Sequence, residues 1–276
     1  MAAAETNDLV AEITQLPVQP GAAMRLLWML EDPRTSAADL GRLIESDPAL
    51  STQVIRLANT AFYGLSGKVA SAWRAVTVLG LATVRALATT AAFDLFSEKG
   101  RSVPDDFWPH SVTTAAAASC VARRLGYQSN DAFSAGLLHD IGAALMFRRA
   151  PRRYDAVLER MATDESVTLV EAEQAEFGIT HAEVGAAALA VMKFPPELTA
   201  AIATHHLNPL SIEPMLGRIV LAADAIACAI EPTMESNIAV CDALVAIGLP
   251  ADAEESLLEE VGRDKDNLAG FLTVHG

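Results

Sequence analysis

Residues 138–142 read Leu-His-Asp-Ile-Gly, and His139-Asp140 is the only adjacent histidine–aspartate pair in the chain. The residues on either side are mostly apolar, so both ionisable groups lie in core-like surroundings. An imidazole or a carboxylate is costly to bury alone, and each therefore needs a partner. Their nitrogen and oxygen atoms are the donors that a metal cluster requires. This stretch predicts a helical core that contains a metal site, in which the His139 imidazole binds one ion and the Asp140 carboxylate bridges that ion to another.

The other candidate ligands lie in the C-terminal part of the chain, whereas the first hundred residues contain no histidine. Each of them, taken alone, has an ordinary alternative as a hydrogen-bonded core residue or a polar helix end. Taken together they favour a metal, because a chain that is 51% hydrophobic has little other reason to hold so many ionisable groups in apolar helices. The predicted ligands are His110, His139, Asp140, His181, His205, His206 and Asp224. We interpret His275, beside the C-terminus, as a solvated tail residue.

The composition is that of a folded, acidic protein. The chain has 276 residues, a net charge of −15 and a mean hydropathy of +0.27. This charge repels nucleic-acid backbones and anionic lipid surfaces, which argues against general nucleic-acid binding and membrane association. The three cysteines form no Cys-x-x-Cys pattern, and residues 1–9 show no signal-peptide pattern. We therefore expect a cytoplasmic protein with reduced thiols.

Helix-start and helix-end signals are frequent, and no convincing alternating β-pattern occurs, so the chain is predicted to be all-α. Asp47-Pro48 predicts a helix from Pro48 to about Thr60, and Ser71 is a candidate cap for a helix over 72–79. The remaining signals are capping boxes at Thr168–Glu171 and Thr180–Glu183 and helix ends at Gly80, Gly126 and Gly178.

A polar stretch at 97–106, with Gly and Pro, divides the histidine-free half from the rest and predicts a linker. We therefore expect an N-terminal helical unit over 1–103 and a metal-site unit over 104–230. Residues 231–276 are predicted to form a C-terminal helical extension, with helices at about 237–247 and 252–272.

The chain also resembles a known family. The stretch 138–142 is similar to the core motif of the HD metal-dependent phosphohydrolase superfamily. The N-terminal half narrows the resemblance to the HDOD family (HD-related output domain), above all through Arg56-Leu-Ala-Asn-Thr-Ala-Phe-Tyr-Gly64. The resemblance extends from about residue 8 to residue 230, and its other similar stretches are Leu16–Pro20, Ile44–Leu50, Ala75–Gly80, Phe107–Ser111, His181–Ala186 and Ala201–His206.

This resemblance implies a compact α-helical bundle in which an N-terminal helical subdomain packs on an HD-type domain. HDOD proteins are bacterial and are often linked to signalling and regulation. A related family, HD-GYP, hydrolyses cyclic di-GMP at a two- or three-iron site, and the seven predicted ligands of this chain fall on ligand positions of that family.

The chain departs from the related family at two features that bind the substrate. Its HD pair is usually followed by a lysine, but the corresponding residue here is Ala143, which removes a cation that could hold a phosphate. Its Gly-Tyr-Pro motif, which helps to form the nucleotide pocket, is absent. The resemblance therefore implies a retained metal site without the substrate-binding apparatus.

The interpretation favoured by these departures is a bacterial signalling module that acts through a protein partner or a ligand, with a nucleotide as one candidate. Aromatic candidates for a contact surface are Trp28, Phe62, Tyr63 and Trp73; core packing is the alternative, and we favour it for Trp28. A second candidate is the basic cluster Arg148, Arg149, Arg152 and Arg153, for which a solvated helix end is the alternative.

The other interpretation is a metal-dependent phosphohydrolase or phosphodiesterase that acts on a nucleotide or cyclic dinucleotide. Asp140 would then be catalytic as the bridge between two metals. His110, His139 and Asp224 would complete one coordination shell, and His181, His205 and His206 the other. Nitrogen and oxygen donors suit divalent iron, manganese or zinc alike. The sequence leaves open whether the protein is an enzyme.

Overall fold

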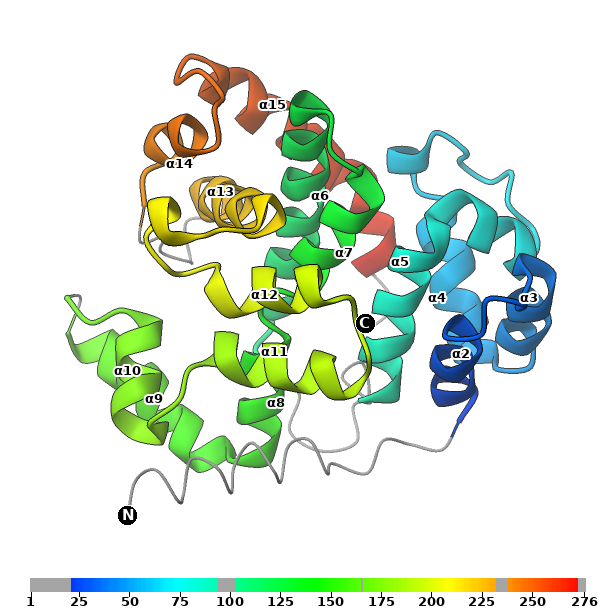
Figure 1. Ribbon diagram of the computed structural model, residues 1–276, viewed down its shortest axis with the longest axis horizontal. Coiled ribbons are helices and arrows are strands. Elements are labelled where there is room, and N and C mark those ends of the chain that lie inside the picture. The colour runs from blue at the N-terminus through cyan, green and yellow to red at the C-terminus, as the bar shows by residue number, and fades with distance from the viewer. Residues whose placement is uncertain (1–20, 94–102, 165, 232–237, 273–276) are drawn as a thin grey trace.

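The computed structural model describes residues 21–93, 103–164, 166–231 and 238–272, and every regular element within these ranges is a helix (Figure 1). The all-α prediction is therefore confirmed. The N-terminal elements are α2 (Ala22–Leu30), α3 (Ala37–Glu45), α4 (Pro48–Ala58), the 3₁₀ turn η1 (Ala61–Tyr63) and α5 (Ala72–Ala92).

The half of the bundle that contains the seven predicted ligands, the metal-site half, begins at α6. The elements that follow form the larger part of the bundle. They are α6 (Phe107–Leu125), α7 (Ser129–Leu138), α8 (Ile141–Arg149), α9 (Pro151–Thr163), α10 (Leu169–Phe177), α11 (His181–Val191), α12 (Pro196–Thr204), the 3₁₀ turn η2 (Pro209–Ser211) and α13 (Met215–Ile230). Two further helices, α14 (Val240–Ala246) and α15 (Ala253–Leu272), complete the described chain.

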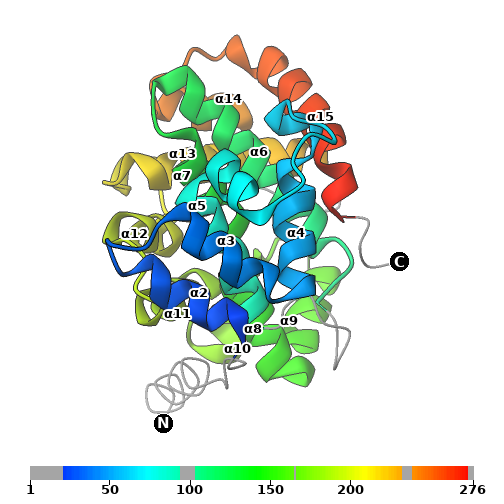
Figure 2. The same cartoon turned by 90° about the vertical axis from the view of Figure 1, so that its right-hand side faces the viewer.

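Helix α6 is the centre of the bundle, and α7, α13 and α15 pack around it (Figures 1 and 2). The four consecutive alanines Ala115 to Ala118 are fully buried in it. Their small side chains let neighbouring helices approach on every side of α6, which is why this helix has no solvent-facing stripe along its middle. The N-terminal helices join this core through α5, which packs on α7.

The capping signals read from the sequence operate as predicted. Asp47 accepts hydrogen bonds from two backbone amides at the start of α4, and both predicted capping boxes are formed, before α10 and α11. Gly126 and Gly178 follow α6 and α10 in the left-handed conformation. Ser71 precedes α5, but its side chain makes no capping bond.

Gly80 interrupts α5 instead of ending the element. Its φ of 77° and ψ of 163° break the helix, which then resumes through residue 92. Only glycine adopts this backbone region readily. By length and composition alone, α5 meets the criteria for a membrane span, but 61% of its apolar window is buried inside the bundle. The break and the burial are typical of a core helix in a folded domain.

The aromatic candidates divide into two groups. Trp28 is 66% exposed and Trp73 is 53% exposed, so our preference for core packing of Trp28 was wrong. Phe62 and Tyr63 are half-buried, and both rings contact Phe133 of α7. These two residues therefore join the N-terminal helices to the metal-site half.

Several expectations lie wholly or partly outside the described residues. They include the 16–20 stretch of the resemblance, residues 97–102 of the expected linker, and His275. Of the linker, residues 103–106 are described, and Val103 is buried immediately before α6.

Candidate metal centre

The His139-Asp140 pair lies at the junction of two helices and not within one. His139 is the C-cap residue of α7, and Asp140 is the N-cap residue of α8. Two neighbours within one helix would point about 100° apart. At the break between α7 and α8, where Asp140 has φ −98° and ψ 13°, both side chains instead face one buried site, and their Nε2 and Oδ2 atoms lie 3.1 Å apart.

The other predicted ligands reach this junction from four further helix positions. His110 lies in the first turn of α6, three residues after its start, directly after Pro109, which a helix tolerates only in its first turn. His181 is the first residue of α11, His205 and His206 follow the end of α12, and Asp224 lies in the middle of α13. The structure therefore brings all seven predicted residues together.

One group of atoms surrounds the Oδ2 atom of Asp140. This oxygen lies 3.1 Å from His139 Nε2 and 3.9 Å from His110 Nε2. Asp224 closes this group, because its Oδ1 atom lies 3.1 Å from His110 Nε2 and 3.8 Å from His139 Nε2. These are two imidazoles and two carboxylates around one small volume.

A second group surrounds the other oxygen of the same carboxylate. Asp140 Oδ1 lies 3.2 Å from His181 Nε2 and 3.6 Å from His205 Nε2. The Nε2 atoms of His181 and His206 are 2.8 Å apart, and those of His181 and His205 are 3.4 Å apart. Asp140 thus faces one histidine group with each of its oxygens, which is the arrangement of a bridging carboxylate.

The hydrogen bonds of the outer ring nitrogens show which inner atoms carry lone pairs. His139 Nδ1 donates to the Gly136 carbonyl at 2.8 Å, and His205 Nδ1 donates to the Ile202 carbonyl at 2.6 Å. A neutral imidazole that donates from Nδ1 has a lone pair on Nε2, as a metal ligand requires. His139 Nε2 and Asp140 Oδ1 are buried without a hydrogen-bond partner. These inward-facing acceptors fit a divalent cation in each group.

His181 has the strongest outer contact of the set. Its Nδ1 lies 2.7 Å from Glu173 Oε2, and its backbone N–H donates to the same oxygen at 2.8 Å. Tyr154 donates to the second oxygen of Glu173 at 2.9 Å. A carboxylate behind a ligating imidazole fixes the ring and increases its basicity. Sequence reasoning missed Glu173, whose signal was a lone acid in the apolar face of α10, eight residues before His181.

The electrostatics of the centre are those of a site that attracts positive charge. Burial opposes ionisation of Asp140, but His139 and His181 outweigh it and hold the pKa of Asp140 well below its usual range. Burial likewise opposes protonation of His181, yet Glu173 and Asp140 raise its pKa well above the ordinary value. Burial together with His205 and His181 lowers the pKa of His206 strongly. These directions disfavour a proton on Asp140 and His206 and favour one on His181, where a metal would compete with it.

Replacing Glu173 with glutamine tests this outer contact. The amide keeps the size of the side chain but removes the charge that supports His181, so we expect metal affinity to fall by roughly 10–100-fold. Titration of the metal-free protein with Mn²⁺ measures the effect. Glu183→Gln is the matched control, because this acid caps α11, the helix that begins at His181, without touching the centre. Equal losses of metal affinity in both variants would contradict the assignment of Glu173.

A second residue that sequence reasoning missed connects the C-terminal extension to the centre. Glu231 is buried at the end of α13, with one oxygen 4.0 Å from His110 Nδ1 and the other 2.7 Å from Lys265 of α15. Thr113 of α6 donates to the latter oxygen at 2.8 Å. Helix α15 thereby contributes to the surroundings of His110.

The predicted basic cluster lies away from the centre. Arg148 donates to the Phe93 carbonyl, and Arg153 pairs with Glu176 at 2.9 Å while its guanidinium lies over the Phe177 ring. None of the four arginines lines the cavities that adjoin the ligands. A ligand- or partner-binding role for the four remains a prediction.

Two cavities adjoin the candidate ligands. One, of about 270 Å³, is lined by His205, His206 and Asp224. The other, of about 260 Å³, is lined by Asp140 and by apolar residues of α6, α8, α9 and α10. Neither has an arginine or lysine among the described residues that line it.

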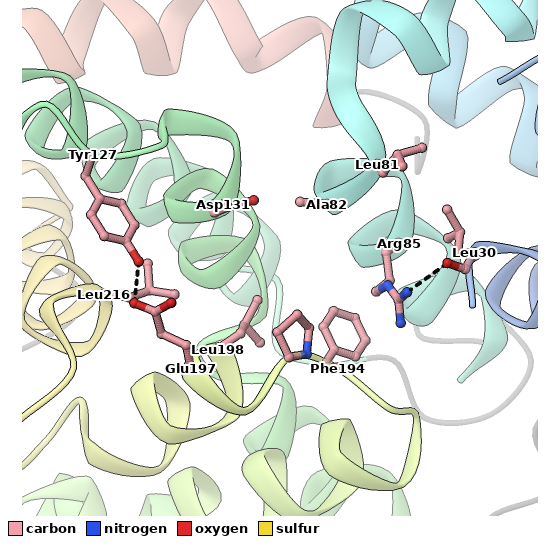
Figure 3. A pocket seen from close by; sticks show the side chains of 11 residues that line it. Leu30, Leu81, Ala82, Arg85, Tyr127, Asp131, Phe194, Glu197, Leu198 and Leu216 are labelled. Atoms are coloured by element: carbon pink, nitrogen blue, oxygen red, sulfur yellow. Dashed lines mark hydrogen bonds between the residues drawn. The ribbon is translucent and has the colours of Figure 1, made fainter. Parts of the chain in front are cut away.

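A third cavity, of about 250 Å³, lies at the junction of the N-terminal helices and the metal-site half (Figure 3). Arg85 lines one side of it and donates to the Leu30 carbonyl, and the hydroxyl of Tyr127 donates to Glu197 on the other (Figure 3). It contains none of the candidate ligands, so it is separate from the centre.

Comparisons with known proteins show which proteins the whole chain resembles in sequence and fold. In the solved structures, the chain is similar to a candidate phosphohydrolase from Shewanella amazonensis SB2B, with 25% identity, a TM-score of 0.74 and coverage of 95% of this chain and 97% of that one. It is also similar to an HDOD domain protein of unknown function from Geobacter sulfurreducens, with 25% identity, a TM-score of 0.70 and coverage of 96% and 98%.

Among curated proteins, the chain is 24% identical over 225 residues to an uncharacterized protein of Treponema pallidum. The match covers 80% of this chain but only 43% of that protein, so the chain spans less than half the length of this relative. The HDOD domain family matches residues 16–208, which include six of the seven candidate ligands and both halves of the helical bundle. The chain belongs to the HDOD domain family.

Proposed function

We propose that this protein is a cytoplasmic signalling module whose HD-type centre binds a pair of divalent metal ions and which acts through a protein partner or a ligand. The observation that carries the metal proposal is the orientation of Asp140. Each of its oxygens faces a separate histidine group, at 3.1 Å and 3.2 Å from the nearest imidazole nitrogens. A buried carboxylate shared in this way is a natural bridge between two cations.

The two proposed shells share Asp140 as their bridge. His110, His139 and Asp224 complete one, and His181, His205 and His206 complete the other. Iron, manganese and zinc all accept such a mixed set of donors. When bound, such ions polarise phosphoryl oxygens and lower the pKa of coordinated water. The Nδ1 contacts of His139, His181 and His205 orient these rings so that their Nε2 atoms would hold the ions.

A regulatory role is supported by what surrounds the centre. A phosphate substrate needs cationic or hydrogen-bonding groups that stabilise its charge in the transition state. The cavities beside the centre offer no arginine or lysine among the described residues that line them, and Ala143 stands beside Asp140 in one of them. Trp28 and Trp73, both more than half exposed, are candidates for the surface that contacts a partner.

A second candidate function is a metal-dependent phosphohydrolase or phosphodiesterase. The observation in its favour is that one cavity, lined by His205, His206 and Asp224, reaches ligands of both proposed shells, and a second cavity reaches Asp140, which the two shells share. A substrate could thus approach the metals without any rearrangement of the bundle. Asp140 would then be catalytic as the metal bridge.

Metal analysis followed by an activity assay separates the two functions. We expect the purified full chain, loaded with Mn²⁺, Fe²⁺ or Zn²⁺, to hold two ions and to leave cyclic di-GMP and bis(p-nitrophenyl) phosphate intact. Turnover that disappears in Asp140→Asn would establish the hydrolase instead. A chain that takes up none of the three metals would contradict both functions.

A further inference from the structure

The cavity of about 260 Å³ that contains Asp140 is lined mainly by apolar side chains, although it adjoins a cluster of ionisable groups. Its walls are formed mainly by Phe107, Phe147, Leu158, Met161 and Leu169, from four different helices. Leu158 is 39% exposed at the edge of the cavity. The described lining therefore resembles a small apolar pocket more than a phosphate site.

The polar groups of the lining are few, and they leave the body of the cavity without a counterion. The Tyr154 hydroxyl is already bonded to Glu173, and Asp106 and Asp140 are acids. No lysine, arginine or histidine occurs among the described residues that line it. An anionic group of a ligand would be stabilised only at the Asp140 end, where the proposed metals lie, because an unpaired charge is costly to desolvate.

The two environments meet at Asp140 and Ala143. Asp140 is only 7% exposed, and its Oδ1 atom has no hydrogen-bond partner, although the residue lines the cavity. Ala143 follows one turn later on α8 and is 8% exposed. A long side chain at this position would occupy the space next to the carboxylate, whereas the alanine methyl group leaves it open to the apolar walls.

We propose that this cavity binds the apolar part of an amphiphile whose single anionic head, a carboxylate or a phosphate monoester, is held at the metal centre. The proposal rests on the proposed metal centre and specifies the chemistry of its ligand. Such a ligand places its charge where cations compensate it and its hydrocarbon where Phe107, Phe147 and Leu158 remove it from water. A cyclic dinucleotide, with two charges and polar sugars, matches this cavity less well.

Calorimetry of the Mn²⁺-loaded full chain with octyl phosphate, octanoate and methyl phosphate tests the proposal. We expect octyl phosphate to bind at least about tenfold more tightly than methyl phosphate, since burial of two methylene groups already accounts for a factor of this order. Comparison of octyl phosphate with octanoate then distinguishes the two head groups. Equal affinities for octyl and methyl phosphate would overturn the proposal.

Ala143→Leu supplies the test within the chain, because it fills the cavity without removing a candidate ligand. We expect octyl phosphate to lose its advantage over methyl phosphate while the metal content stays unchanged. Leu158→Gln, at the exposed edge, should weaken octyl phosphate in the same direction and guards against a folding defect in the first variant. Ala251→Leu, at an exposed position before α15, is the matched control.

The outcomes distinguish a failure of this proposal from a failure of the metal-centre proposal on which it rests. Absence of bound Mn²⁺ in the wild-type chain would refute the metal centre itself. Bound Mn²⁺ with no preference for the octyl chain, or a preference that survives Ala143→Leu and Leu158→Gln in folded protein, would refute only the apolar subsite.

Discussion

Asp140→Asn should reduce the metal capacity of the chain from two divalent ions to at most one. Asparagine is nearly isosteric with aspartate, but it offers one oxygen in place of two and no negative charge. The change therefore removes the bridge and leaves His139 and His181 facing a neutral group. We expect affinity for the remaining ion to fall by more than the roughly 10–100-fold that loss of an outer-sphere partner costs. Metal analysis and titration of the metal-free protein with Mn²⁺ measure both quantities.

The control for this substitution is Asp131→Asn on α7. Asp131 lies on the helix that precedes the His139-Asp140 pair, but it lines the separate cavity between the two halves (Figure 3). Its replacement should leave both ions in place. If Asp140→Asn kept two tightly bound ions, Asp140 would not be the bridge and the division of the centre into two shells would be wrong.

Gly142→Ala should destabilise the protein by about 3 kcal/mol and weaken metal binding. Gly142 lies where α8 crosses the start of α11. A Cβ atom there would overlap the backbone carbonyl of His181 and lie 2.6 Å from the Gly185 nitrogen. Both obstacles are backbone atoms, so the helices must separate to admit the methyl group. That movement carries His181 away from Asp140. Chemical denaturation followed by circular dichroism measures the change in the free energy of unfolding.

Gly262→Ala is the matched control for the helix crossing. Gly262 lies within α15, and a Cβ atom added there meets no heavy atom within 4 Å. Because alanine favours the helix by about 1 kcal/mol over glycine, we expect this variant to be as stable as the wild type or more so. Similar destabilisation of both variants would show that the crossing of α8 and α11 is not the cause.

Much of the fold was predictable because its signals are local. The capping boxes at Thr168 and Thr180 and the Asp47-Pro48 start each depend on residues within one helical turn, and all three form as predicted. Gly80 was only partly predicted. The sequence shows that a helix stops there, but whether the chain then turns away or resumes along α5 depends on packing against α3, α4 and α7.

The candidate ligands could be named from the sequence, because each is an ionisable residue in an otherwise apolar stretch. The residues that contact these ligands from outside the centre could not be named in the same way. Glu173 is marked only by its place on the apolar face of α10, and Glu231 reads as an ordinary helix acid, until the fold places them beside His181 and His110. Trp28 shows the converse, since its apolar character suggested the core and only the packing of α2 shows it to be exposed.

By itself, then, the sequence determined the helical class, the principal helix starts and the seven residues of the candidate centre, because these follow from local chemistry and from the cost of burying charge. Only the tertiary structure decided that the His139-Asp140 pair lies at the junction of two helices and that Asp140 faces two histidine groups. The tertiary structure also decided that an apolar cavity adjoins Asp140. These properties arise where residues from distant parts of the chain meet, and no local pattern specifies the directions in which packed helices cross.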